Sequence, residues 1–380
     1  MTIKKGEMMN MSKTKRMVLV IFLLAICLCV PLSVMAAETK TPAPVGASDF
    51  LKSLSLVGDL QLRYEYTDKD IPGVETDNKE RYRFRMGMNW DNPDENWKVS
   101  AGLCTGGLAA NSTTATYSET QVFETGDIRL DYAYAEHKLD NFKLLAGQQK
   151  NPFASTWALW DTDVRPAGFT AGVDLKPAFI TAGVYQARYL GKDNPDIAFM
   201  EAIQAGMKND VLTAALAFYN YNRVDKYIVK EGMDKDYSYQ IVDLYLSGDI
   251  ATDAAALTPY AQAFCNLGAK GEKGQSIQGG NLDPEKENIG YVVGVDAKID
   301  RIKLGVAWAQ IGADSVMQAL MDSSFGAAIG STDSEGFKLN LGYALTKHFS
   351  ITTTAYLCEA KERDLNQHTQ LYQLDLDYKF

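Results

Sequence analysis

Four arginines, three of them at alternating positions, are the residues of this sequence with the clearest capacity for chemistry. They are Arg63, Arg81, Arg83 and Arg85. Guanidinium groups stacked along one face could organise a field or attract anions, because they stay charged at every accessible pH. The alternative is that they solvate a polar wall and pair with Asp59 and Glu65. The elements that carry them must decide between these two interpretations.

A serine and a histidine form the second candidate group. His348 and Ser350 lie two residues apart, so a strand would place both on one face, a spacing that a hydrolase could use. Phe349 and Ile351 occupy the opposite face. We therefore expect His348 and Ser350 to point to a polar interior beside a short turn, away from lipid substrate. The sequence predicts no enzyme.

The cysteines and acidic clusters do not suggest a metal or a cofactor. Three of the five cysteines lie far apart, at Cys104, Cys265 and Cys358. That spacing fits neither metal ligation nor a disulfide framework. Acidic residues cluster at Asp193, Asp196, Asp234 and Asp236. Their spacing lacks the glycine turn and terminal glutamate of a calcium loop. We interpret them as solvated acidic residues, with cation bridging to lipopolysaccharide as the alternative.

The N-terminus has the order of features of an export signal. Lys13, Lys15 and Arg16 precede an apolar run over 17–35, and small residues follow at Ala36 and Ala37. An uncleaved membrane anchor is the alternative. Removal of residues 1–36 takes away five basic residues and one acid and changes the net charge from −10 to −14. So acidic an exported chain is a poor candidate for binding nucleic acid, which needs clustered positive charge.

The rest of the chain alternates apolar and polar residues in segments of about ten. Within 371–380, every second residue from Tyr372 to Phe380 is apolar, and polar residues lie between them. A strand separates these two sets onto opposite faces, whereas a helix would mix them. Sixteen such segments are predicted, near 55–67, 80–90, 97–105, 127–138, 142–149, 168–176, 178–189, 198–208, 211–222, 238–249, 257–267, 289–299, 302–312, 335–345, 348–358 and 370–380.

The connections between these segments alternate long and short. Residues 68–79 and 106–126 are long connections, whereas 91–96 and 139–141 are short. A transmembrane β-barrel shows this asymmetry, with short periplasmic turns and long outer loops. The sequence therefore predicts an all-β, antiparallel, up-and-down transmembrane barrel of about sixteen strands. Residues 1–36 would be the signal peptide, 37–54 a short periplasmic lead-in and 55–380 the barrel.

Several segments resemble a known family, the large group of bacterial outer-membrane proteins usually called putative porins. The resemblance covers essentially all of 55–380. The segments that show it are 58–66, 81–85, 145–153, 160–168 and the strand that ends in Phe380. It implies a water-filled channel in the bacterial outer membrane for passive diffusion of small hydrophilic solutes and ions. A channel specific for an anion or a sugar is the alternative, followed by a barrel enzyme or a surface adhesin. The resemblance also implies a homotrimer surrounded by outer-membrane lipid and lipopolysaccharide.

The resemblance further implies functional positions. In many sixteen-stranded porins the third long loop folds inward and narrows the pore, and the matching connection here is 150–167. Its candidate pore-lining residues are Trp157, Trp160, Asp161, Asp163 and Arg165. Of these, Asp161 and Asp163 are expected to face the four arginines across the narrow point. An ordinary outer loop is the alternative. The terminal strand is similar to the signal that the barrel-assembly machinery reads, at positions Tyr372, Leu374, Leu376, Tyr378 and Phe380.

Overall fold

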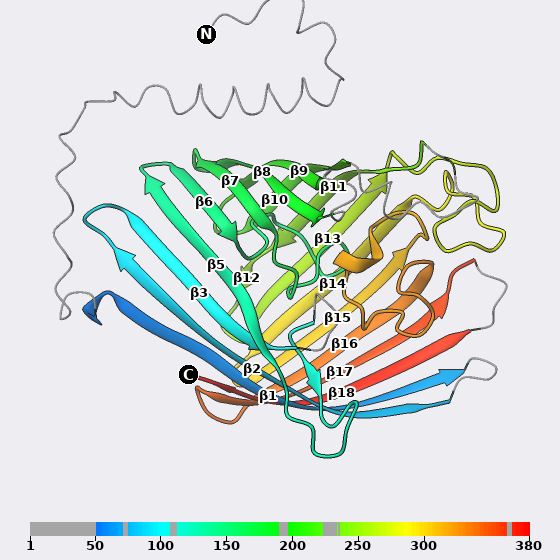
Figure 1. The fold of residues 1–380 in the computed structure, drawn as a ribbon, viewed down its shortest axis with the longest axis horizontal. Coiled ribbons are helices and arrows are strands. Elements are labelled where there is room, and N and C mark those ends of the chain that lie inside the picture. Colours follow the sequence, from blue (N-terminus) through cyan, green and yellow to red (C-terminus); the bar gives the residue numbers. More distant parts are fainter. Residues whose placement is uncertain are drawn as a thin grey trace, which may run out of the picture. The chain divides into compact units, whose positions relative to one another are not determined.

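The computed structural model is a closed antiparallel β-barrel (Figure 1). The structure describes residues 51–70, 75–106, 112–189, 197–222, 234, 236–362 and 367–380. The barrel occupies the compact unit Ser53–Phe380. Within the described residues, eighteen strands form one sheet: sixteen build the wall, and β4 and β12 are short additions of two residues each. The predicted signal peptide and most of the lead-in lie outside the described residues.

The strands are β1 (Leu54–Asp70), β2 (Asp77–Asn92), β3 (Trp97–Thr105), β4 (Ala115–Thr116), β5 (Ile128–Leu139), β6 (Phe142–Gln148), β7 (Ala167–Asp174), β8 (Ala178–Tyr189), β9 (Ile197–Lys208), β10 (Leu212–Asn222), β11 (Tyr239–Gly248), β12 (Ile250–Ala251), β13 (Ala256–Asn266), β14 (Ile289–Ile299), β15 (Ile302–Ile311), β16 (Ser334–Ala344), β17 (Phe349–Ala360) and β18 (His368–Lys379). The sixteen wall strands confirm the sixteen predicted segments. The two short strands were not predicted. Among the described residues, no helix has the length and hydropathy needed to cross a membrane.

The first and last strands close the barrel. β1 pairs with β18 in a register that places Leu62 opposite Leu376. Beyond the end of β18, the backbone N–H of Gly58 donates to the Phe380 carbonyl at 3.0 Å, and the Phe380 N–H donates back to the Gly58 carbonyl at 3.1 Å. Closure satisfies the backbone groups that an open sheet would expose to lipid, where water cannot bond them.

The short turns lie at one end of the barrel. Asn96, Asp140 and Asp300 take left-handed conformations there, with φ of 57°, 47° and 47°. Asn and Asp tolerate this region better than other residues that have a side chain, because the short polar group can bond the local backbone. These residues allow adjacent strands to reverse within two to four residues. They account for three of the short connections at this end of the barrel.

The outer face of the wall is apolar, and the inner face is polar on one side. On β1, Leu60 and Leu62 are exposed on the outside, whereas the intervening Asp59 and Gln61 are buried inside. A soluble sheet would bury the apolar set instead. An apolar outside around a polar interior is the pattern of a barrel that is solvated by lipid.

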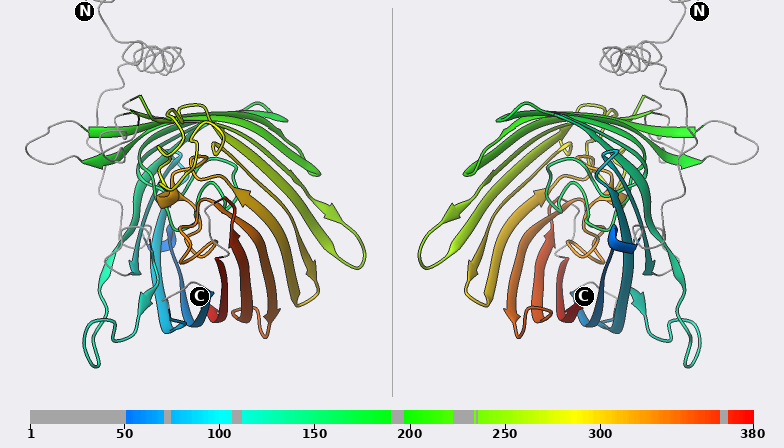
Figure 2. Two further views of the ribbon diagram at one scale, coloured as in Figure 1. Left: turned by 90° about the vertical axis from the view of Figure 1, so that its right-hand side faces the viewer. Right: turned by 90° about the vertical axis from the view of Figure 1, so that its left-hand side faces the viewer.

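The inner wall of β8–β15 is apolar and is covered by loops. Its inward-facing residues include Met200, Tyr219, Ile241, Val292 and Ile311, all nearly inaccessible. Figure 2 shows chain segments inside the ring of strands, including the orange segment between β15 and β16. The loops packed there create a core within the barrel, so the polar part of the interior lies along β1, β2 and β18.

Candidate functional site in the barrel interior

The four predicted arginines lie on the inner face of β1 and β2, and each is paired with a carboxylate. Arg63 binds Asp375 of β18 through two hydrogen bonds of 2.7 and 2.9 Å. Arg81 lies 3.1 Å from Glu65. Arg83 and Arg85 share Asp59, at 3.0 and 2.7 Å. The pairing with Asp59 and Glu65 that we considered as an alternative is therefore present.

The ion pairs have a layered arrangement. The arginine side chains retain 14–28% of their accessible surface, whereas their carboxylate partners retain 6–11%. Positive groups thus lie nearer the open interior, with negative groups beneath them. Four arginines meet three wall carboxylates, and the charge left over is faced by Asp163, 3.8 Å from Arg85. The four arginines are therefore ion-paired and still present a basic surface to the interior.

Loop 149–166, between β6 and β7, crosses the interior and contacts the far wall. The Ala154 N–H donates to the Gln204 Oε1 of β9 at 2.8 Å, and the Gln204 Nε2 donates back to the Ala154 carbonyl at 2.9 Å. The N–H of Thr156 donates to the Oε1 of Gln262 on β13 at 2.8 Å. Each such bond contributes roughly 1 kcal/mol net. Phe153 adds an edge-on contact with Tyr219.

The charged residues of this loop have different environments. Asp163 accepts a hydrogen bond from the Thr113 hydroxyl at 2.7 Å in addition to facing Arg85. Arg165 pairs with Asp131 of β5 at 3.0 Å, and both side chains are almost fully buried. Asp161 contacts loop 312–333 instead. Its N–H donates to the Leu320 carbonyl at 2.6 Å, and its Oδ1 accepts from the Asp163 N–H. Of the two predicted acidic residues, Asp163 is the one that faces an arginine of the wall.

The two predicted tryptophans pack rather than project into open space. Trp160 is buried and lies 6.2 Å from Tyr219, centroid to centroid. Trp157 lies 5.0 Å from Phe325 and beneath the ammonium group of Lys338. Their role as pore-lining residues stays a prediction.

Lowering the pH should change the ion preference of this site through Asp161. Burial, and then the nearby charge of Asp322, raise the pKa of Asp161 to about 6. Above that pH the carboxylate is charged and favours cations; below it the charge is lost. We expect the zero-current potential in a salt gradient to move toward anion preference as the pH falls from 7 to 5. Asp161→Asn should remove this step, and an unchanged step in the variant would show that another group titrates.

A second loop in the interior was not predicted. Loop 312–333, between β15 and β16, buries Val316, Met321, Phe325 and Ile329 against the wall and against loop 149–166. Two signals in the sequence could have revealed it. The loop is unusually apolar for an outer connection, and 211–222 is apolar at most positions instead of alternating. A strand that is apolar on both faces is covered on both, here by loop segments inside the barrel.

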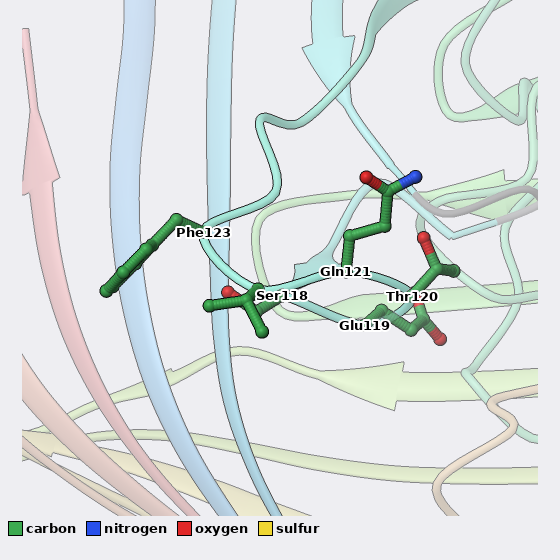
Figure 3. Close-up of a pocket in the computed structure, with 6 residues that line it drawn as sticks. Ser118, Glu119, Thr120, Gln121 and Phe123 are labelled. Atoms are coloured by element: carbon green, nitrogen blue, oxygen red, sulfur yellow. The ribbon is translucent and has the colours of Figure 1, made fainter.

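A cavity of about 620 Å³ lies between the two loops and the wall. Its charged margin is formed by Arg129, Asp131, Asp163 and Arg165, and its apolar margin includes Trp160 and Met317. A smaller hollow of about 380 Å³ lies within one turn of the loop between β4 and β5 (Figure 3). Phe123 in that turn is 92% exposed, so the smaller hollow is a feature of an outer loop and not of the interior.

The other candidate groups lie apart from this site. The ring Nδ1 of His348 is 2.8 Å from the Lys379 carbonyl beside a short turn, and Ser350 is opposite Asp377 in the register of β17 and β18. Within the ranges that the structure describes, no group of three or more His, Cys, Asp or Glu residues could hold a metal ion. Asp193 and Asp196 lie outside the described residues. Asp234 caps its own turn by accepting from the Asp236 N–H at 2.7 Å.

The predicted assembly signal lies on the lipid-facing side of β18. These exposed side chains are Tyr372, Leu374, Leu376, Tyr378 and Phe380. The ring of Phe380 stacks 6.5 Å from Phe84 across the closure of the barrel. A side chain at position 58 would meet this ring at 2.4 Å, so Gly58 leaves the space that the ring uses.

Replacing Phe380 by alanine should lower the amount of folded barrel in the outer membrane. Phe337 of β16 is the matched control, because it also faces outward and is 47% exposed against 48% for Phe380. Both substitutions remove the same lipid-facing area, and only one changes the terminal residue. The fraction of heat-modifiable protein on a gel measures assembly. Equal losses in the two variants would mean that lipid contact matters rather than the terminal signal.

Comparisons with known proteins agree with this architecture. Residues 64–241 match the family described as putative porin. The structure is similar to Acinetobacter baumannii OccAB4, with a TM-score of 0.52 and 12% identity over 86% of this chain and 98% of that one. It is also similar to a mutant of Rhodopseudomonas blastica porin, with a TM-score of 0.51 and 10% identity over 86% of this chain and all of that one. No curated protein matches the sequence.

Proposed function

We propose that this chain, whose residues 64–241 match the putative porin family, is a water-filled channel through which small hydrophilic solutes and ions diffuse passively across the outer membrane. The observation that carries the proposal is the inverted wall, with apolar side chains outside and paired charges inside. Such a wall is stable only between lipid and water. The family and the fold point to a channel rather than an enzyme.

The narrowest part of the proposed channel lies between loop 149–166 and the arginines of β1 and β2. The contact of Asp163 with Arg85 and Thr113 brings the loop to the wall on one side. Arg63, Arg81 and Arg83 would line the same wall beside this contact. Selectivity in such a pore depends on width and on the charges at the narrow point. We propose that loop 149–166 sets the width and that the arginines set the local field.

A substrate-specific channel is the second candidate. The 620 Å³ cavity favours it, because charged and apolar side chains together line a space of ligand size. A small solute with an anionic group and an apolar part would suit such a site. A sugar that stacks on an aromatic ring is the other solute class that remains open. Current that saturates with one added solute would support specificity, whereas a linear response would support general diffusion.

The cellular setting is proposed on the same basis. Residues 1–36 would direct export and be removed, residues 37–54 would lie on the periplasmic side, and the terminal strand would be read by the barrel-assembly machinery. The apolar outer face suits contact with outer-membrane lipid, and the outer loops suit contact with lipopolysaccharide. We propose a homotrimer of independent pores.

Single-channel recording of the refolded mature chain in a planar bilayer tests the proposed function. We expect stable conductance steps, grouped in threes for a trimer, and a zero-current potential whose sign gives the ion preference. A folded barrel that passes no current would contradict the channel and favour the adhesin or enzyme alternatives.

A further inference from the structure

A lysine of the wall holds the two interior loops together. The Nζ of Lys338, on the inner face of β16, lies 2.8 Å from the Oδ2 of Asp322 in loop 312–333. The same ammonium group lies 4.7 Å from the ring centroid of Trp157 in loop 149–166. It is also 5.1 Å from the ring of Tyr356 on β17. One side chain thus contacts both loops and the neighbouring strand.

Asp322 forms the ion pair with Lys338, and its carboxylate oxygens and its backbone N–H also form hydrogen bonds. Its Oδ2 also accepts from the Tyr356 hydroxyl at 3.0 Å, and its Oδ1 accepts from the Ser324 N–H at 3.0 Å. Its own N–H donates to the Trp157 carbonyl at 2.9 Å. The nearby Lys338 cation outweighs the effect of burial and keeps the pKa of Asp322 below its usual value. Asp322 therefore stays charged across the physiological range and needs a cation beside it.

The two loops also pair directly through their backbones. The bond from the Asp322 N–H to Trp157 is joined by one from the Asp161 N–H to the Leu320 carbonyl at 2.6 Å. Movement of loop 312–333 relative to loop 149–166 must therefore break these two backbone bonds. The position of one loop depends on the position of the other.

Loop 312–333 also reaches the charged wall. The Nε2 of Gln373, on β18, is 3.4 Å from the Ser324 hydroxyl and 3.0 Å from the Oε2 of Glu65. Glu65 in turn pairs with Arg81. Loop 149–166 touches the same wall farther along, where Asp163 meets Arg85. The passage beside the arginines is therefore limited by a different loop at each of its two margins.

We propose that Lys338 is a positioning residue that keeps loop 312–333 inside the barrel and, through it, sets the width of the passage beside the arginines. The inference deepens the proposed constriction and rests on it. Removing the cation leaves the buried charge of Asp322 with only two neutral hydrogen-bond donors, the Tyr356 hydroxyl and the Ser324 N–H, and a buried charge without a counter-ion is strongly unfavourable. The loop then leaves the interior so that Asp322 can reach water, and the passage widens.

Lys338→Met tests this proposal, because it keeps the apolar stem and removes the charge. We expect the single-channel conductance to rise at least about twofold and the current to become noisier, since pore width governs conduction. Lys338→Arg should retain the wild-type conductance. Lys303→Met is the matched control: Lys303 also points inward, from β15, and is exposed near a short turn. It loses the same charge, and we expect no change in conductance.

A second measurement does not depend on conduction. Ser324→Cys should react slowly with a charged thiol reagent when Lys338 is present and at least about ten times faster in the K338M background, because the exposed thiol of a released loop is more accessible. Asp322→Asn replaces K338M if that variant fails to fold: it breaks the ion pair that anchors loop 312–333 to the wall, and we expect a smaller rise in the same direction. Wild-type conductance together with an unchanged reaction rate would overturn the role of Lys338. If the wild-type barrel passed no current but the K338M substitution still raised the reaction rate, the channel would be overturned and the role of Lys338 would stand.

Discussion

Replacing Arg81, Arg83 and Arg85 by glutamine is expected to shift the zero-current potential strongly toward cation preference. The three substitutions remove the positive layer that lies above Asp59 and Glu65 and leave Asp163 without its facing charge. A unit charge about 4 Å from a passing ion contributes roughly 1 kcal/mol in water, which is about fivefold in local ion concentration. The shift should be largest in dilute salt and shrink as screening increases.

The control for this prediction removes a charge elsewhere in the interior. Lys303→Gln takes away one inward-facing cation of β15 that has no role in the arginine wall, and we expect only a small shift. Single substitutions should rank by exposure, with Arg85 ahead of Arg83, because their side chains retain 28% and 14% of their surface. If the triple variant folds and keeps the wild-type potential, the arginines do not border the path of the ions.

Shortening loop 149–166 should produce the largest rise in conductance. Replacing 154–163 by a short Gly-Ser linker removes the bonds to Gln204 and Gln262 and opens the space that the loop occupies. We expect conductance to increase about two- to threefold and larger solutes to pass, because the narrowest section limits both. Single-channel recording and a liposome swelling series with sugars of increasing size measure the two effects.

A matched control exists in the loop that contains Phe123. Replacing 117–126 by the same linker deletes an equal number of residues from a segment whose Tyr117 and Gly126 contact Tyr82 on the outer face of β2. This change should leave conductance unaltered. An equal rise in both variants would indicate a general loosening of the barrel, and no rise in either would mean that loop 149–166 does not limit the pore.

The prediction of the strands from the sequence succeeded because a lipid-solvated wall imposes a strict pattern. In β18, Leu374 and Leu376 must face hydrocarbon while Gln373 and Asp375 face the interior, so the period of two is visible in the residues themselves. The alternation of apolar and polar residues is lost where a loop covers the inner face. In β10 the inward residues Ala217 and Tyr219 pack against loop 149–166 and are apolar like the outward ones. The strand was still recognised there, and the reason for its apolar inner face was not.

The candidate site was predictable only in part. The sequence placed Arg63 and Arg81 on an inner face, because each alternates with outward apolar residues. Their partners could not be chosen, since Asp375 lies 312 residues from Arg63 in the chain and meets it only when β18 closes on β1. The role of Lys338 was likewise hidden, because its contacts with Asp322 and Trp157 require two loops to fold inward together.

The sequence by itself therefore determined the barrel class, the strands and, in the alternating strands, the face on which each side chain lies. These follow from local alternation and from the demand that lipid places on every backbone group. The sequence carried signals for the loops that enter the barrel, and only the tertiary structure decided which residues those loops contact, which charges are paired and where the polar passage runs. Those features depend on contacts between distant segments, such as Thr156 with Gln262, and no local pattern of residues encodes them.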